Sequence, residues 1–468
     1  GPGFVNFFIQ PAVWQSVLPE VCRQNEGYGQ SAVGAGRKVL VEFVSANPTG
    51  PLSVGHGRQA VLGDAICRLL IATGHLVTRE YYYNDAGRQM RVLGESTRAR
   101  YLELLGLPFS FPEDGYQGEY IRDIARGMVE EFGDAHKDTV EVTIFKERAE
   151  RAIFADINGT LERLGIHFDN YYNEHSLYDS GLIDEVVAAL RAKGLVYDQE
   201  GAVWFRATQF GHDKDRVIIK SSGEPTYRLP DIAYHREKFR RGFDWMVDIF
   251  GSDHIATVPD VLAGVEALGY DPSKVTVVLH QFVTLMREGH QVKMSTRKAN
   301  FVTVDELVDE VGTDVVRFFF LMRKADSQLE FDLDLATKQS QENPVYYMQY
   351  GHARLSSIGR KAEEKGVARG ELAGADLSLL KEPEELALLK MLAAWPGLVE
   401  SAALDLEPHR VIFFMQEMAA QFHSYYNKQR IISDDLALSR ARLWLAEGLR
   451  IILRNGLNLI GVKAPESM

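Results

Sequence analysis

The chain has 468 residues, 46% of them hydrophobic, and a net charge of −13 at pH 7. This length suits roughly two to four domains. The sequence has no run of about 18 uncharged apolar residues and only two cysteines, so we expect no membrane span, no zinc or disulfide framework and a cytoplasmic location. The acidic charge argues against broad, non-specific binding of nucleic acid.

The first elements indicate a parallel sheet. The β-branched run KVLVEFV (38–44) predicts a strand, the apolar spacing over 55–74 predicts a helix, and HLVTREYYY (75–83) predicts a second strand. Strand, helix and strand in this order form a βαβ unit. We therefore expect an α/β fold, a doubly wound parallel-sheet (Rossmann-type) domain over 36–342, preceded by an N-terminal extension over 1–35.

The rest of the chain changes character twice. Residues from about 90 to 200 are charged and helical in pattern, which predicts an insertion, and strands return at 244–254 and 274–283. From Asn343 to residue 468 the pattern predicts an all-α bundle. From His409 onward there are eight Lys or Arg and five Asp or Glu, a net of +3. Solvated helix faces would explain this balance, and a nucleic-acid surface is the alternative.

A possible nucleotide loop, NPTGPLSVGHGR (47–58), joins the first strand to the first helix. The free N–H groups of a helix N-terminus attract phosphate, Gly55 allows close approach of a ligand, and His56 can donate a hydrogen bond. The loop is not a P-loop, because G-x-x-x-x-G-K-[ST] is absent. For the Gly-His pair alone, an ordinary tight turn is the better explanation.

A second loop, KMSTRK (293–298), is short and basic and follows the last predicted strand of the domain. Lys293, Arg297 and Lys298 could neutralise a triphosphate during attack on its α-phosphorus. A solvated basic turn explains the same residues equally well.

Together the two loops resemble the H-x-G-H and K-M-S-K-S motifs of class I aminoacyl-tRNA synthetases. Longer segments resemble the arginyl-tRNA synthetase family and follow its order along the chain: VEFVSANPTGPLSVGHGRQAVLGDAICRLL, REYYYNDAGRQM, YQGEYI, PTYRLPDIAYH, GSDH, KMSTRKAN, SQENPVYYMQYGHAR and the closing GLNLIGVKAPESM. The resemblance implies arginine–tRNA ligation: ATP and Mg²⁺ activate arginine as arginyl-adenylate, and the arginyl group passes to tRNA(Arg). It also implies a soluble monomer without protein ligands to a metal.

The resemblance assigns roles to particular residues. Ser53, His56, Lys293 and Lys298 would be catalytic. ATP would bind at Asn47, Pro48, Gly50, Gly55, His56, Gly251, Asp253, His254, Lys293, Met294 and Ser295. Arginine would bind at Glu42, Ser45, Asn47, Tyr227, Asp231 and Tyr234, where a carboxylate suits the guanidinium fork. Tyr425, Tyr426 and Arg430 would stack on or pair with anticodon bases. The simpler roles are a helix N-cap for Asp231 after Pro230, and core or rim positions for the tyrosines.

Three features depart from the family pattern. Ser53 stands where the family has the first histidine, and Thr296 replaces the second lysine of K-M-S-K-S, so Lys298 or Lys38 would have to supply that charge. The family also has an N-terminal domain of about a hundred residues, of which GPGFVNFFI resembles only the closing segment. Two alternatives therefore stay open: a catalytically impaired tRNA-binding paralogue or variant, and a class I synthetase for another amino acid.

Overall fold

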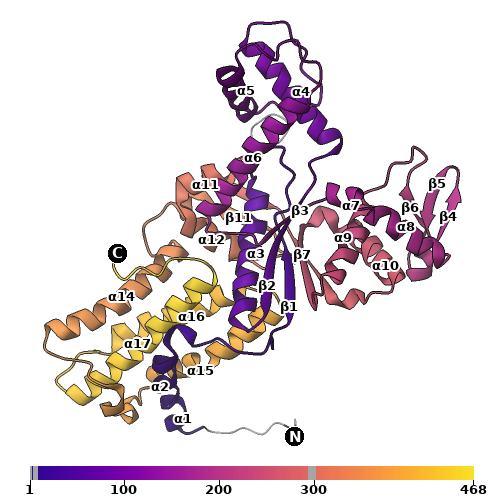
Figure 1. Ribbon diagram of the computed structural model, residues 1–468. Helices are drawn as coiled ribbons and strands as arrows, with labels where there is room; N and C mark the ends of the chain where they lie inside the picture. The colour runs from indigo at the N-terminus through magenta and orange to yellow at the C-terminus, as the bar shows by residue number, and fades with distance from the viewer. Residues whose placement is uncertain (1–2, 4–8, 293–301) are drawn as a thin grey trace.

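A five-stranded parallel sheet forms the centre of the molecule (Figure 1). The computed structural model describes residue 3 and residues 9–292 and 302–468. The strand order is β3-β2-β1-β7-β8, and every neighbouring pair is parallel. The strands are β1 (Lys38–Glu42), β2 (Leu76–Tyr83), β3 (Asn170–Asn173), β7 (Trp245–Gly251) and β8 (Val275–His280). Residues 39–41 are fully buried, as expected for a strand covered on both faces.

Helices cover both faces of this sheet, which confirms the expected α/β fold. Helix α3 (Val54–Ala72) packs against β1, β2 and β7 and is buried along most of its length. On the other face, α9 (Arg228–Arg240) and α10 (Val258–Leu268) pack on a cluster formed by Leu40, Met246 and Val275. Parallel strands require such crossover helices, because each strand must return to the same end of the sheet.

Two excursions leave the carboxyl edge of the sheet, where the sequence predicted one insertion at about 90–200. The first contains α4 (Gly87–Leu104), α5 (Glu119–Phe132) and α6 (Thr143–Arg163) and projects as a tower at the top of Figure 1. The chain then returns as β3, which pairs with β2, so the predicted block is interrupted by a strand of the main sheet. The second excursion contains α7 (His175–Asp179), α8 (Leu182–Ala192), β4 (Val196–Gln199), β5 (Ala202–Phe205) and β6 (Arg216–Ile219).

A short subdomain follows β8. Its strands β9 (Val283–Arg287), β10 (His290–Gln291) and β11 (Leu329–Asp332) form a small sheet in the order β10-β9-β11. Its helices are α11 (Val304–Val311), α12 (Thr313–Leu321) and α13 (Leu333–Ala336). Helices α11 and α12 both pack on α3, so this subdomain lies beside the start of that helix.

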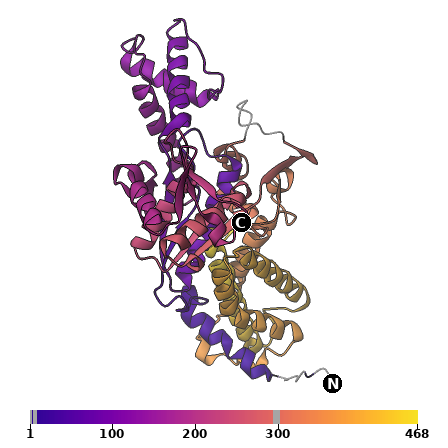
Figure 2. The ribbon, with the colours of Figure 1, turned by 90° about the vertical axis from the view of Figure 1, so that its right-hand side faces the viewer.

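The C-terminal part is a helical bundle, as predicted, and the N-terminal helices belong to it. The bundle contains α14 (Pro344–Glu364), α15 (Pro383–Leu404), α16 (His409–Lys428) and α17 (Leu436–Leu459), and α1 (Pro11–Gln15) and α2 (Val17–Gln24) pack on α15 and α17 (Figure 2). The Tyr28 hydroxyl donates to the Leu392 carbonyl (2.9 Å), and the Trp395 indole donates to the Tyr28 carbonyl (3.1 Å). The segment predicted as an extension is therefore part of the bundle's packing.

Helix α15 is, among the described residues, the one helix long and apolar enough to cross a membrane by length and composition alone. It packs against α16, α17 and α3, and Trp395 at its middle is fully buried. A core helix satisfies the same test of length and composition, so this one carries no membrane assignment.

One buried arginine joins the bundle to the sheet domain. The Arg317 guanidinium donates to the Asp64 carboxylate (2.6 Å) and to the carbonyls of Leu164 (2.7 Å) and Ile460 (3.1 Å). These partners lie on α3, after α6 and after α17. A Cβ on Gly461 would overlap the guanidinium, so the close approach requires glycine there.

Candidate functional site

The site lies where the strand order reverses, at the carboxyl ends of β1 and β7. The chain leaves β1 through two residues in the left-handed region, Val44 (φ 68°) and Ser45 (φ 43°). A β-branched residue is rare in this conformation, and such outliers gather at functional sites. The turn is held by the Ser45 hydroxyl, which donates to Glu42 (3.1 Å) and accepts from the Tyr82 N–H (3.2 Å).

Ser53 has a structural role as the N-cap of α3. Its backbone is extended, as an N-cap requires, and its N–H donates to Nδ1 of His56 (3.3 Å). The Ser53 hydroxyl lies 3.1 Å from the same nitrogen. Serine at the N-cap with a polar side chain at the third helical position is the capping-box arrangement, here with histidine in place of the usual glutamate.

This capping orients His56 as a neutral donor. Because Nδ1 accepts from Ser53, the ring proton belongs on Nε2, which leaves that nitrogen able to donate. Burial lowers the pKa of His56, although Asp253 opposes the shift, so the ring is neutral at pH 7. Among the described residues, a Cβ on Gly55 would meet only the Ser53 hydroxyl, at 3.7 Å, so these residues leave space above the helix N-terminus.

The ends of β7 and β8 form the other side of the crevice. Gly251 at the end of β7 pairs with His280 at the end of β8. Asp253 and His254 follow β7 in a short turn and are both exposed. The His254 ring stacks on Phe250, with the ring centroids 5.3 Å apart. Burial lowers the pKa of His280 to about 4, and Arg58 and His56 contribute. Sequence reasoning missed His280, because a lone histidine at the end of a strand carries no pattern.

A buried ion network lies beneath β1. The Lys238 ammonium donates to Glu42 and to Asp248, each at 2.6 Å, and Nε2 of His235 lies 2.8 Å from Asp248. Burial would raise the pKa of Asp248, but Lys238 and His235 hold it below its usual range. Burial raises the pKa of Glu42 despite the neighbouring Lys238. The network places two carboxylates and one ammonium in the buried interior, where each charge needs a partner.

Asp231 and Glu174 form the part of the pocket that is not balanced by a cation. Among the described residues, no Lys or Arg forms an ion pair with either carboxylate. The pKa of Asp231 is raised to about 7, mainly by burial and also by Glu42 and Glu174, against the opposing effect of His235 and Lys238. Burial also raises the pKa of Glu174, which accepts from the Tyr82 hydroxyl (2.9 Å) and the Asn84 amide (2.8 Å).

Several positions in this pocket differ from the sequence prediction. Asp231 is not an N-cap: α9 begins at Arg228, with Tyr227 as its N-cap, and Asp231 lies in its first turn. Tyr227 is 87% exposed at the rim, so its ring is not gathered into the pocket with Asp231. Tyr234 is buried and its hydroxyl donates to Glu80, while its ring lies 4.5 Å from that of Tyr82. It therefore forms a wall of the pocket. Glu174, Tyr82 and Lys238 were not predicted.

The remaining predicted loop residues are held by neighbours from the first excursion. The Asn47 side chain accepts from the Asn84 N–H (3.0 Å) and donates to Gln89 (3.1 Å). Pro48 and Gly50 continue this bend. Lys293, Met294, Ser295, Thr296 and Lys298 lie outside the described residues. The chain that follows them pairs with the nucleotide loop, because Ser53 bridges Thr303 and the Val304 N–H donates to Leu52 (2.9 Å).

The three predicted tRNA contacts in the bundle have different surroundings. Tyr425 is buried and its hydroxyl donates to Glu385 (3.1 Å), so it is a core residue that cannot stack on a base. Tyr426 is half-buried beneath the Arg354 guanidinium (4.2 Å to the ring centroid), and Arg430 is exposed. One of the arginines counted in the positive charge after His409 is not on the surface: Arg442 pairs with the buried Glu385 (2.8 Å).

A second aromatic group lies beside Tyr426 and was not predicted. Tyr346, Tyr347 and Tyr350 occupy α14, and His423 on α16 lies between them, with ring centroids 4.9 Å from Tyr347 and 6.4 Å from Tyr350. The three tyrosines are half-buried, so each exposes part of its ring. Aromatic rings next to a guanidinium are the usual platform for unpaired bases.

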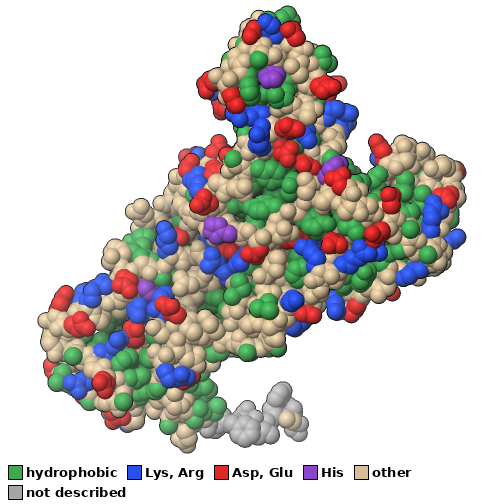
Figure 3. All heavy atoms as spheres, viewed as in Figure 1, with side chains coloured by type: hydrophobic (Ala, Val, Ile, Leu, Met, Phe, Trp, Pro, Cys, Tyr) green, Lys and Arg blue, Asp and Glu red, His purple; other side chains and the backbone are tan. Residues whose placement is uncertain are grey.

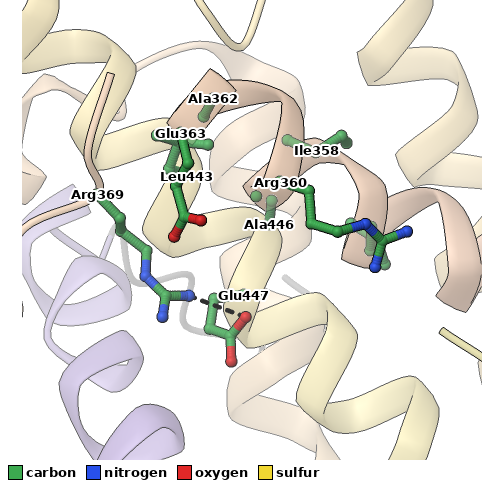
Figure 4. Close-up of a pocket in the computed structure, with 10 residues that line it drawn as sticks. Ile358, Arg360, Ala362, Glu363, Arg369, Leu443, Ala446 and Glu447 are labelled. Atoms are coloured by element: carbon green, nitrogen blue, oxygen red, sulfur yellow. Dashed lines mark ion pairs between the residues drawn. The ribbon is translucent and has the colours of Figure 1, made fainter. Parts of the chain in front are cut away.

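Two partly open hollows among the described residues lie away from this site. One, of about 170 Å³, lies between α14 and α17, where Arg369 and Glu447 form an ion pair (2.9 Å; Figure 4). Another, of about 270 Å³, lies between β8 and the α15–α16 connection. In Figure 3, basic and acidic side chains are interspersed over this face of the bundle. The chemistry of the carboxyl edge, rather than cavity volume, therefore defines the candidate site.

Comparisons with known proteins agree with this arrangement. Residues 17–318 match the family described as tRNA synthetases class I (R), catalytic domain, and residues 348–468 match the DALR anticodon binding domain. The arginine–tRNA ligase of Desulfotalea psychrophila is 69% identical over the whole chain, which covers 85% of that relative; that of Syntrophotalea carbinolica is 52% identical, with the same coverage.

Solved structures show the same similarity. A Campylobacter jejuni protein described as an arginyl-tRNA synthetase superposes with a TM-score of 0.91 at 31% identity, covering 98% of this chain and 100% of that one. The Thermus thermophilus arginyl-tRNA synthetase, at 24% identity, has a TM-score of 0.77 over 99% of this chain and 87% of its own, and so shares the fold.

The charge of the pocket predicts that arginine binding depends on pH. If arginine binds here, its guanidinium pairs with the ionised form of Asp231, whose pKa is about 7, so binding at lower pH must expel a proton. We expect the dissociation constant for arginine to rise about tenfold from about pH 8 to about pH 6. Isothermal titration calorimetry measures this dependence. Asp231→Asn should bind more weakly with a flat profile, and an unchanged slope in that variant would contradict the assignment.

Proposed function

Because the chain belongs to the arginyl-tRNA synthetase family, we propose that its three regions divide the work of arginine–tRNA ligation: an arginine pocket, a nucleotide loop and a tRNA-binding bundle. The ligation uses ATP, arginine and tRNA. ATP and arginine first give arginyl-adenylate and pyrophosphate, and the arginyl group then passes to the 3′ end of tRNA(Arg).

The uncompensated carboxylates carry the assignment of the arginine pocket. Asp231 would accept the guanidinium, and Glu174, which is close enough to raise the pKa of Asp231, would provide a second carboxylate. A guanidinium offers five donors in a planar fork, so two adjacent carboxylates satisfy it better than they would satisfy an ammonium. Glu42 and Ser45 lie nearer the loop and would position the amino-acid backbone, and Tyr227 would close over the bound side chain from the rim.

Adenylate formation at this site needs positioning and charge stabilisation more than acid–base chemistry. An oxygen of the arginine carboxylate attacks the α-phosphorus of ATP, the bond to the bridging oxygen breaks, and pyrophosphate leaves. A carboxylate needs no base to act as nucleophile. The Nε2–H of His56 and the N-terminal N–H groups of α3 would stabilise the charge that develops on the phosphate oxygens, together with Lys293 and Lys298 of the basic loop.

Mg²⁺ would enter with ATP. Among the described residues there is no cluster of three or more His, Cys, Asp or Glu side chains that could hold a metal. The ion would be held mainly by the triphosphate oxygens, which is how Mg²⁺ commonly binds beside nucleotides. We further propose that the enzyme works as a monomer in the cytosol.

The bundle would read the anticodon through the aromatic group on α14 and α16. The Arg354 guanidinium lies over the rings of Tyr426 and Tyr350, which combines a cation with aromatic stacking surface, and the exposed Arg430 would contact phosphate. Tyr425 is left out of this proposal because of its burial in the core.

An arginylation assay tests the proposed function. The purified chain should attach arginine to tRNA(Arg) and should not attach lysine. Asp231→Asn and Glu174→Gln should each raise the KM for arginine at least tenfold, about 1.4 kcal/mol or more, with little change in the KM for ATP. The surface variant Asp198→Asn, which removes an exposed partner of Arg191, serves as the control. No charging at all would favour an impaired paralogue, and charging with a different amino acid would refute the pocket assignment.

The aromatic group predicts a separate effect on tRNA. Tyr426→Ala removes a ring that one base could stack on, which is worth about 1–3 kcal/mol. We expect the KM for tRNA to rise about tenfold while the KM values for ATP and arginine stay constant. Phe413→Ala is the control, because Phe413 is an exposed aromatic residue on the same helix, α16, and lies outside this group. Equal effects of the two variants would contradict the anticodon proposal.

Ser53→His tests what the first motif histidine would add. The N–H of residue 53 that holds His56 is a backbone group, so the substitution keeps that bond and the orientation of the ring. A second imidazole at the helix N-terminus would supply another donor to the reacting phosphate, and we expect kcat to rise by up to about 10²-fold with little change in the KM for ATP. The comparison uses one tRNA preparation for both proteins, and a flat or lower kcat would show that the site has adapted to serine.

A further inference from the structure

The motif YQGEYI (116–121) has no role in the proposed chemistry, yet it lies against the nucleotide loop. It lies at the base of the α4–α6 tower, where residues 116–118 precede α5 and residues 119–121 form its first turn. The Tyr120 hydroxyl donates to the Thr49 carbonyl (2.7 Å), and Gln89 on α4 accepts from the Asn47 amide (3.1 Å). The tower therefore contacts the loop through two hydrogen bonds that join segments far apart in the chain.

Two glycines make this contact sterically possible. A Cβ on Gly118 would lie 2.2 Å from Cε1 of Tyr120, so glycine is needed for the ring to fold back over its own turn. A Cβ on Gly50 would lie 2.9 Å from the Tyr120 hydroxyl and 3.2 Å from Cζ. One glycine on each side of the contact thus leaves room for the tyrosine, which explains the spacing Gly-x-Tyr in the motif.

The loop needs such support because its own backbone is irregular. Val44 and Ser45 have left-handed φ values immediately before it, and residues 47–50 belong to no helix or strand. An irregular segment keeps one shape only where its surroundings hold it. Burial raises the pKa of Tyr120, so its hydroxyl stays protonated and remains a donor throughout the working pH range.

We propose that Tyr120 is a positioning residue through which the helical tower holds residues 47–50 in the shape that accepts ATP. The tower is then a structural component of the nucleotide site rather than an appended module. This inference rests on the proposed role of the loop in binding ATP. It concerns the nucleotide step alone, so arginine recognition at Asp231 should not depend on the Tyr120 hydroxyl.

The test compares two tyrosines of the tower. Tyr120→Phe removes the hydroxyl that contacts the loop, and Tyr101→Phe removes a hydroxyl that donates to the Gly133 carbonyl (2.6 Å) within the tower itself. We expect Tyr120→Phe to lower kcat/KM for ATP about tenfold and to weaken ATP binding, with the KM for arginine unchanged. Tyr101→Phe should change neither quantity. Equal kinetic effects of the two variants, or equal losses for ATP and arginine, would overturn the proposal.

A double-mutant cycle tests the contact directly. Gly50→Ala should impair ATP use in the natural background, because the new methyl group meets the Tyr120 hydroxyl, and should cost less when residue 120 is phenylalanine. Additive effects would contradict the contact. The calorimetric dissociation constant for ATP separates this proposal from the proposed ligase function. Failure of the chain to charge tRNA would count against the ligase function. Weaker ATP binding by Tyr120→Phe, but not by Tyr101→Phe, would still support the positioning role.

Discussion

Helix α3 is the constraint on which the rest of the molecule depends. Its first turn forms the floor of the nucleotide loop, its middle is buried against the sheet, and Asp64 binds the arginine that joins the sheet domain to the bundle. Gly57 and Gly63 let it approach Val304 and Phe43 more closely than any larger residue would allow. Because interiors are packed as densely as crystals, a helix held at so many points cannot shift at one end alone. The bundle and the nucleotide loop are therefore mechanically linked.

The electrostatics of the pocket has two levels that serve different purposes. In the lower level, Lys238 pairs with both Asp248 and Glu42, which keeps the ends of β1 and β7 together and allows carboxylates to remain in the interior. In the upper level, Asp231 and Glu174 have no cation partner in the described part of the chain, and burial raises the pKa of both carboxyl groups. Without the lower level, the upper carboxylates would face further uncompensated charge. The network thus allows the folded protein to place these two carboxylates together, as the proposed arginine pocket requires.

Sequence reasoning identified the fold better than the surroundings of individual residues. The parallel sheet, helix α3 and the C-terminal bundle followed from hydrophobic periodicity, which burial imposes directly. The position of β3 did not, because four polar and aromatic residues at the end of a helical excursion have no strand periodicity. Asp231 was identified through the family resemblance, but Glu174 was not, since an isolated glutamate gains meaning only from its neighbours in space. Tyr425 and Tyr426 are adjacent in sequence, and their different burial depends on which way α16 faces the core.

Helix capping explains how serine at residue 53 fits this site. Serine is among the best N-cap residues, and here its N–H, which any residue would supply, holds His56 in the tautomer that donates from Nε2. The side chain that differs from the family pattern is therefore separable from the backbone bond that orients the remaining histidine. Serine removes one potential donor to the phosphate, while the free N–H groups of α3 and the His56 ring stay in place. A site built in this way keeps the groups needed to bind and orient the nucleotide, and the consequence of serine should fall on the rate of the chemical step rather than on the affinity for ATP.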